Sequence, residues 1–346
     1  PGTPRNPPAH PRMSALSPAW AAPLALALLA AAPISSLAVL AGLGSAATWA
    51  LGSHLFGQSL ARHTGLSPAA ANLFKNASTA LLFGLAMLGF GWAWPSAQAP
   101  WLLLSGFLGF AVGDALYFAA FPRCGVQLAA LSANLIPPLA ALLGFLWRGT
   151  RLSPLGMLGM AITLAGIAWV VTDRSSRGAG VPQVPAAERR RGLAYAGLAA
   201  LAQSIAIVAG ARGFEGLSME PSGLLPGTVV RLVGGALGAL LLAALAGPIS
   251  GRGLAPLREL AAPLRSPALA VALCVPSSIA AWINLPMHSL ALARLPEGLA
   301  AILFALTPVF TLPIGWFLGA RYGLRTALGT GLAFGGVSLV ILYGSA

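Results

Sequence analysis

The sequence predicts an all-α, polytopic membrane protein with ten transmembrane helices arranged as two inverted halves of five. Hydrophobic residues make up 57% of the 346 residues and charged residues only 8%, and the mean hydropathy is +0.82. Such a chain has too little polar surface to cover a soluble globule of this size. The apolar residues lie in continuous runs of about 20 residues, without the alternation of a barrel strand, so each run is expected to cross the bilayer as a helix.

An internal duplication predicts the two halves. The stretch from Leu135 to Val171 recurs 170 residues later, from Ala305 to Ile341. An odd number of helices in each copy places the second copy upside down in the membrane, and an inverted pair offers two equivalent ways of closing around one central site. The residues that punctuate both copies in register are Pro138, Gly149, Gly159 and Gly166 in the first and Pro308, Gly319, Gly329 and Gly336 in the second.

The elements follow in chain order. Residues 1–34 are expected to be a disordered or signal-like segment, in which the short apolar run 19–34 allows a signal-like stretch, an interfacial helix or an extra N-terminal hydrophobic helix. The first repeat is assigned to 35–172, the linker to 173–191 and the second repeat to 192–346. The expected spans are 35–57, 69–91, 100–121, 125–147, 153–172, 192–212, 224–247, 267–290, 296–319 and 324–344.

The basic charge is attributed to the loops. The formal net charge is +13, but the basic residues are spread over short connections instead of forming one face, which favours the positive-inside tendency over a nucleic-acid site. The connections on one side carry 12 arginines and those on the other side 6, so the linker between the halves is expected in the cytoplasm. Both ends of the ten-span core then lie outside, unless residues 19–34 cross as an eleventh helix.

Polar side chains inside the expected spans form the candidate site. An ionisable group at mid-bilayer costs about 2.5–3.5 kcal/mol on insertion scales. Asp114 is the only acid well within a span, and its repeat mate 170 residues later is Asn284. Tyr117 shares the helical face of Asp114, and His288 shares that of Asn284. Asp114 is expected either to pair within the bundle, with Lys75 as a partner, or to titrate a proton or contact the substrate.

Basic and amide residues extend this polar lining. Lys75 in span 2 lies 156 residues before Arg231 in span 7, and either side chain is expected to snorkel to an interface or to bind an anionic group or neutralise Asp114 in the cavity. An amide or hydroxyl residue taken alone is more often an interhelical contact than a ligand. Those singled out are Asn72 and Asn76 beside Lys75, Asn134 before the Pro137–Pro138 break, Thr307 before Pro308, and the pair Thr48 and Gln203 matched at 155 residues.

Other polar or reactive groups are assigned to structure. Glu297 follows Pro296 and is expected to stabilise a helix N-terminus rather than to bind a ligand. Cys124 and Cys274 show no metal spacing and are expected to be reduced, packed thiols. The matched glycines are expected to permit close helix packing.

Enzyme signatures are missing from the sequence. It contains no HExxH, GxSxG or Walker sequence, no cluster of Cys and His, and no second intramembrane Asp to form a dyad with Asp114. We therefore expect no enzyme activity, no cofactor and no metal. Without a nucleotide-binding motif, active transport would have to use an ion or substrate gradient.

Two long stretches resemble the EamA-domain family of the drug/metabolite transporter superfamily, whose members have ten helices in two repeats. They are GDALYFAAFPRCGVQLAALSANLIPPLAALLGFLWRGTRLSPLGMLGMAITLAGI and GLAAILFALTPVFTLPIGWFLGARYGLRTALGTGLAFGGVSLVIL. The resemblance covers roughly residues 36–344 and implies a multi-pass secondary transporter of the cell inner (plasma) membrane. Many such proteins export amino acids or other small metabolites.

The chain departs from this family at two positions. Members commonly carry Glu in an LGE motif after spans 4 and 9, where this sequence has Thr150 and Ala320. The departure implies a subfamily with altered substrate or coupling. The basic residue of span 2 and its mate in span 7, commonly Arg in the family, are here Lys75 and Arg231.

The prediction is a secondary transporter of a small polar metabolite that works by alternating access. Its expected partners are a small-molecule substrate, membrane lipid, and protons or another coupling ion; nucleic acid is not expected, and a homodimer is one option. The alternatives are a lipid-moving or lipid-sensing protein with a groove open to the bilayer, and a membrane enzyme with a second acid or metal beside Asp114. The residues expected to bind substrate or couple transport are Lys75, Asp114, Tyr117, Asn134, Gln203, Arg231, Asn284 and His288.

Overall fold

The regular structure of the chain is helical. The computed structural model describes residues 36–62, 68–124, 129, 132–172, 185–249, 258, 267–317 and 323–344, and these contain no β-strand. The segment 1–34 and most of the expected linker 173–191 lie outside the described residues.

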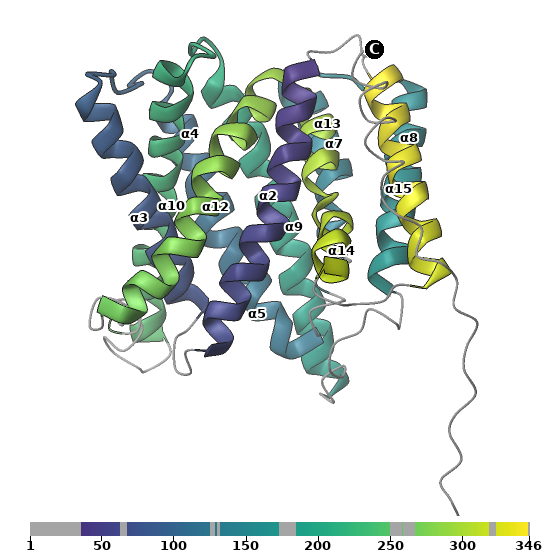
Figure 1. Cartoon of the computed structure of the whole chain (residues 1–346), viewed down its shortest axis with the longest axis horizontal. Coiled ribbons are helices and arrows are strands. Elements are labelled where there is room, and N and C mark those ends of the chain that lie inside the picture. The colour runs from purple at the N-terminus through teal and green to yellow at the C-terminus, as the bar shows by residue number, and fades with distance from the viewer. Residues whose placement is uncertain are drawn as a thin grey trace, which may run out of the picture.

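Most of the described helices follow the expected spans (Figure 1). In the expected span 125–147, however, the described continuous helix begins at Ile136, and the expected span 296–319 is divided at residues 305–306. The helices of the first half are α2 (Ser36–Arg62), α3 (Pro68–Gly89), α4 (Ala99–Gly106), the π-helix η2 (Phe107–Gly113), α5 (Asp114–Cys124), α7 (Ile136–Arg148) and α8 (Pro154–Thr172). Those of the second half are α9 (Ala186–Phe214), α10 (Pro221–Ile249), α12 (Pro267–Arg294), α13 (Glu297–Phe304), α14 (Thr307–Phe317) and α15 (Leu324–Tyr343). Helix α9 begins inside the segment expected as the linker.

The length and composition of the helices indicate a polytopic membrane protein. Six stretches of the described residues are long and apolar enough to cross a bilayer: 99–124, 154–172, 186–214, 221–245, 297–314 and 324–343. Large apolar side chains also face outward, and Leu88, Leu146 and Phe317 are each more than 60% exposed. A soluble monomer rarely shows such an apolar surface.

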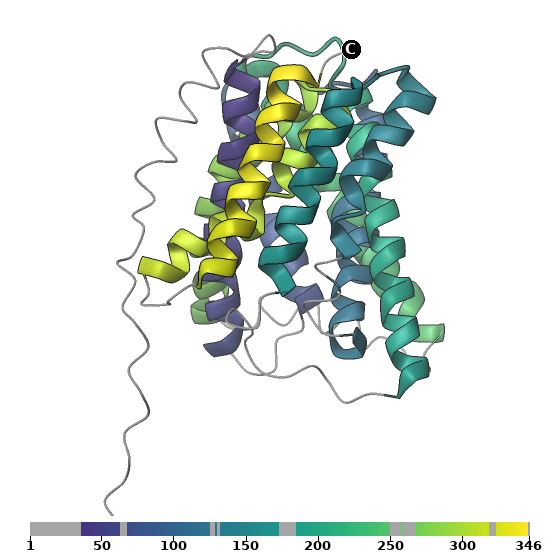
Figure 2. The same ribbon diagram turned by 90° about the vertical axis from the view of Figure 1, so that its right-hand side faces the viewer.

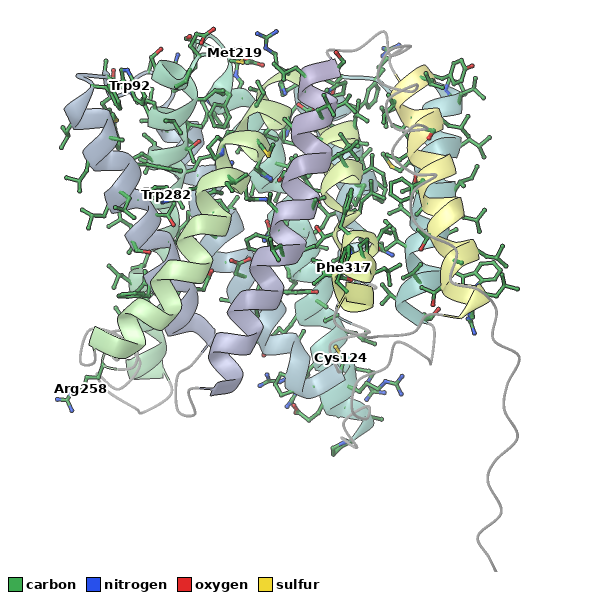
Figure 3. All side chains as sticks on the ribbon, viewed as in Figure 1. Trp92, Cys124, Met219, Arg258, Trp282 and Phe317 are labelled. Carbon is green, nitrogen blue, oxygen red and sulfur yellow. The ribbon has the colours of Figure 1, made fainter. Side chains whose placement is uncertain are left out.

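The bundle has two distinct ends. Trp92 and Met219 lie at one end, and Cys124 and Arg258 lie near the other (Figure 3); we call these the Trp92 end and the Cys124 end. Helix α2 begins at the Trp92 end, whereas α9 begins at the Cys124 end (Figure 1). The two helices that open the halves therefore run in opposite directions.

Helices α8 and α15 pack side by side at one edge of the bundle (Figure 2). A Cβ added at Gly166 would lie 2.6 Å from the carbonyl oxygen of Gly329, and one added at Gly336 would lie 2.6 Å from the carbonyl oxygen of Gly159. Residue numbers rise along α8 as they fall along α15, so the helices are antiparallel. Because backbone touches backbone, only glycine fits at these positions.

Each half contains a proline-associated interruption at the matched place. Residues 134–135 form a turn directly before α7, whose first turn holds Pro137 and Pro138. Residues 305–306 form a turn between α13 and α14, and Pro308 follows. Proline lacks the N–H that would continue the helical ladder, which frees carbonyls in the preceding turn. The Thr307 hydroxyl donates to one of them, the Phe304 carbonyl, at 2.8 Å.

A pair of adjacent glycines tests the α8–α15 contact. A Cβ added at Gly336 would lie 2.4 Å from the Thr163 nitrogen, whereas one added at Gly335 meets nothing within 4 Å. We expect Gly336→Ala to lower the unfolding free energy by about 1–3 kcal/mol through overpacking. Gly335→Ala is the matched control and should be neutral or slightly stabilising, because Ala is the better helix former. Thermal unfolding of the two purified variants in detergent checks this, and equal melting temperatures would contradict it.

Candidate functional site

Asp114 is the centre of a polar cluster between the halves. It opens α5 directly after the π-helix η2. Its Oδ2 accepts a hydrogen bond from Asn72 Nδ2 of α3 at 3.0 Å, and its Oδ1 accepts one from Gln203 Nε2 of α9 at 3.2 Å. Both carboxylate oxygens thus have an amide donor, and Gln203 comes from the opposite half of the chain.

The same two amides also donate hydrogen bonds to backbone carbonyls of η2. Asn72 Nδ2 donates to the Phe110 carbonyl at 3.2 Å, and Gln203 Nε2 donates to the Gly109 carbonyl at 3.1 Å. A side-chain amide has two N–H donors, so each here serves one carboxylate oxygen and one carbonyl. The wider turn of a π-helix is common at functional sites. A Cβ on Gly113 would lie 2.9 Å from Gln203 Nε2, so glycine lets this amide approach.

Asn284 forms a second cluster, on α12. Its Nδ2 donates to the Ser45 carbonyl at 2.6 Å, to Ser45 Oγ at 3.0 Å and to Thr48 Oγ1 at 3.3 Å, and its side chain is buried. Asn284 is the repeat mate of Asp114, and Thr48 is the repeat mate of Gln203. The contacts Asp114–Gln203 and Asn284–Thr48 therefore join matched positions across the two halves.

Arg231 lies in the protein interior on α10, only 3% exposed. Its Nε donates to Ser105 Oγ at 3.1 Å, and Ser105 Oγ in turn donates to the Ala206 carbonyl at 2.6 Å. The guanidinium carbon lies 5.2 Å from the centre of the Phe110 ring. Its Nη1 is buried and has no hydrogen-bond partner among the described residues.

Two of the remaining expected site residues lie near charged members of the site, since Tyr117 interacts electrostatically with Asp114 and His288 with Arg231. The His288 ring stacks on Phe304, with ring centres 3.9 Å apart. Tyr117 packs against an apolar group around Cys124, and Asn134 is half-buried in the turn before α7. Lys75 belongs to α3, but its side chain lies outside the described part, and so does its expected pairing with Asp114. Within the described residues, no group of three or more His, Cys, Asp or Glu is arranged to hold a metal ion.

Comparison with known proteins identifies the first half. The model of the EamA-like transporter family matches residues 36–172. Residues 36–172 are an EamA-like domain of the drug/metabolite transporter superfamily. The resemblance drawn from the sequence is thereby confirmed for residues 36–172, and the matched family suggests a membrane transporter. The matched family implies a small-molecule substrate and a multi-pass membrane location.

The whole chain shares its fold with a solved protein. A structure titled "Crystal structure of protein" is 19% identical and superposes with a TM-score of 0.63, covering 88% of this chain and 97% of that one. At this identity the likeness shows the fold alone. No curated protein sequence matches the chain.

An ion network at the Trp92 end of the bundle was not expected. Arg148 at the end of α7 pairs with Glu297 of α13 and, at 2.6 Å, with Glu215 after α9. Glu215 also pairs with Arg212. Glu297 is fully buried and accepts a further hydrogen bond from Thr150 Oγ1 at 2.7 Å. Its carboxylate therefore holds the end of α7 and the turn that follows it, beyond the helix-terminal role expected for Glu297.

Two further residues were missed because their side chains carry little sequence signal. Ser45 and Ser105 are buried hydroxyl residues within apolar runs, and each contacts a polar residue of the other half. Neither has a hydroxyl mate in the repeat, so the matching that brought out Thr48 and Gln203 passes over them. Their position one helical turn from Gly42 or Gly109 would have been the only hint.

Substitutions of two separate glutamines test whether the Asp114 cluster stabilises the bundle. We expect Gln203→Leu to lower the unfolding free energy by about 1–3 kcal/mol, because the Gly109 carbonyl and one Asp114 oxygen lose their donor. Gln98→Leu is the matched control; Gln98 stands before α4 and its side chain makes no capping hydrogen bond. Thermal unfolding of both variants in the same detergent gives the measurement. Equal losses of stability in the two variants would show that the hydrogen bonds of Gln203 do not stabilise the bundle.

Proposed function

We propose that this protein is a secondary transporter that moves a small polar metabolite across the cell inner (plasma) membrane by alternating access. The observation that carries the proposal is the matched pair of contacts, Asp114–Gln203 and Asn284–Thr48. Two equivalent polar contacts at the interface of two repeats are what a carrier with one central site and two closed forms needs.

An inverted ten-helix repeat is part of this proposal. Support comes from the contact between α8 and α15. Gly159 faces Gly336, the repeat mate of Gly166, and Gly166 faces Gly329, the repeat mate of Gly159. A two-fold axis that relates the two repeats produces this crossed pairing. The opposite directions of α2 and α9 agree with it (Figure 1). In such folds one repeat rocks against the other around a fixed site near the bilayer midplane.

Interrupted helices supply the irregular backbone of that site. Transporters of this kind bind substrate and coupling ion where helices are broken, because free carbonyls and helix ends are available there. Here the interruptions before α7 and between α13 and α14 lie in opposite halves, and η2 adds a third irregular segment next to Asp114. Side chains proposed to contribute are those predicted from the sequence: Lys75, Asp114, Tyr117, Asn134, Gln203, Arg231, Asn284 and His288.

Asp114 is proposed as the coupling residue. It is an acceptor-only group when ionised and gains a donor when protonated, so a proton changes which contacts with Asn72 and Gln203 it can make. Because the contact with Gln203 crosses between the halves, protonation would shift the balance between the two closed forms. The energy for uphill movement would then come from a proton or other ion gradient.

The ion network is proposed as the gate at the Trp92 end. Arg148 connects α7 of the first half to Glu297 of the second half in a buried place. At the Cys124 end a single cross-half pair of the described residues, Arg123 with Glu188, is about one-third exposed. The network accordingly favours the form that is closed at the Trp92 end.

Variants of Asp114 test the coupling role. In proteoliposomes loaded with a metabolite extract, we expect the wild type to release a subset of polar metabolites and to do so faster with an imposed pH gradient. Asp114→Asn should slow this release by about tenfold, equivalent to about 1.4 kcal/mol, and remove the pH dependence. Glu220→Gln, at an exposed position, is the matched control.

The same vesicles separate the alternatives. Release that is unchanged in rate and pH dependence by Asp114→Asn would remove Asp114 from the mechanism. Movement of a fluorescent phospholipid between leaflets, without release of any polar metabolite, would replace the transporter proposal with the lipid-moving alternative.

Variants of Arg148 test the gate. We expect Arg148→Gln to weaken closure at the Trp92 end, because Glu297 is then left as a buried carboxylate without its cation. A thiol placed by Ser45→Cys in a Cys124→Ser, Cys274→Ser background reports opening through its rate of reaction with a polar thiol reagent in nanodiscs. The rate should rise several-fold with Arg148→Gln and stay unchanged with Arg212→Gln, which removes only an exposed pair. Equal rates in both variants would argue against the gate.

A further inference from the structure

The unpaired nitrogen of Arg231 is the most exceptional polar group of the described interior. Its Nη1 is the one buried side-chain nitrogen or oxygen of the described residues that has no hydrogen-bond partner. Within the protein interior a cation that lacks both a counter-ion and a full set of acceptors is strongly destabilising. Such a group therefore points to an anionic partner from outside the chain.

The guanidinium is fixed in place for such a partner. Ser105 accepts from Nε and is itself anchored on the Ala206 carbonyl, so the hydroxyl orients the fork and leaves Nη1 free. Phe110 lies beside the guanidinium carbon. Close packing of α4 on α10 holds this arrangement, because a Cβ on Gly106 would lie 1.7 Å from the Arg231 carbonyl oxygen.

Charge balance selects the kind of partner. Arg231 carries one positive charge, and Ser105 and Phe110, which contact its guanidinium, carry none. His288, which interacts with Arg231 electrostatically, supplies no negative charge. A singly charged anion neutralises the site, whereas a doubly charged phosphate would bring a second negative charge into a low-dielectric interior. The planar fork of arginine matches a planar carboxylate through two parallel hydrogen bonds.

We propose that the free edge of Arg231 binds a carboxylate of the transported substrate, which makes this protein a carrier of monocarboxylates. The inference rests on the proposed function and narrows it to one substrate class and one contact. Ser105 acts as a positioning residue, because it accepts a hydrogen bond from Nε of the guanidinium and does not itself contact the substrate, which binds to Nη1. Residues of both halves meet at this point, Ser105 and Phe110 from the first and Arg231 from the second, so a bound carboxylate would be held between the repeats.

Small carboxylates and their neutral amides test the contact directly. The full chain in nanodiscs is titrated with acetate or benzoate, and in parallel with acetamide or benzamide, at constant ionic strength while its melting temperature is recorded. We expect the carboxylates to raise the melting temperature of the wild type and the amides to leave it unchanged. Arg231→Gln should abolish the shift, whereas Arg190→Gln, which removes an exposed arginine, should retain it.

A second variant keeps the test decisive if Arg231→Gln does not fold. Ser105→Ala keeps the charge of Arg231 but removes the acceptor that orients its guanidinium. The half-saturating concentrations of acetate and of benzoate should therefore both rise several-fold. Equal shifts from carboxylate and amide, an undiminished shift in Ser105→Ala, or an equal shift from chloride or phosphate would each overturn the inference.

Flux measurements distinguish this inference from the proposed function. Proteoliposomes that release polar metabolites but show no carboxylate binding at Arg231 would leave the transporter proposal standing and remove the substrate class. Carboxylate binding that depends on Arg231, without flux of acetate, benzoate or any extracted metabolite, would instead remove the transporter proposal.

Discussion

The need to satisfy every polar group without water governs the interior of this bundle. Within hydrocarbon an unpaired carbonyl or carboxylate costs several kcal/mol, so each must find a partner inside the protein. Asn72 and Gln203 meet this need for Asp114 and, with their second N–H groups, for the carbonyls of η2. One irregular helix segment and one acid are therefore stabilised together, and the amide from α9 makes that stability depend on both halves of the chain.

Close approach of backbones is what allows those contacts to form. Gly113 makes room for Gln203, Gly106 brings α4 against α10, and Gly166 and Gly336 bring α8 against α15. Without a hydrophobic driving force between helices in lipid, such contacts and interhelical hydrogen bonds are the main sources of association. Gly106 thus sets the distance at which Ser105 reaches Arg231.

The sequence predicted the helices well because their length is imposed by the bilayer and their composition is extreme. It also paired Asp114 with Asn284 and Thr48 with Gln203, since the repeat preserves their spacing. It did not predict that Asp114 and Gln203 touch, because matching within a repeat says nothing about contacts between repeats. The network of Arg148, Glu297 and Thr150 was missed for a related reason: its members are far apart in the chain and have no charged mates.

This network makes the duplicated halves unequal. The repeat mate of Glu297 is Gln127, and that of Arg148 is Leu318, so the second copy of the ion pair does not exist. Exposed ion pairs such as Arg123–Glu188 contribute about 0–1 kcal/mol, far less than separating a buried pair costs. For a carrier, resting states of unequal free energy give different half-saturation constants on the two faces of the membrane. In the proposed carrier the final gradient is unaffected, and the pair of Arg148 with Glu297 contributes to the difference between the cargo concentrations at which the two faces respond.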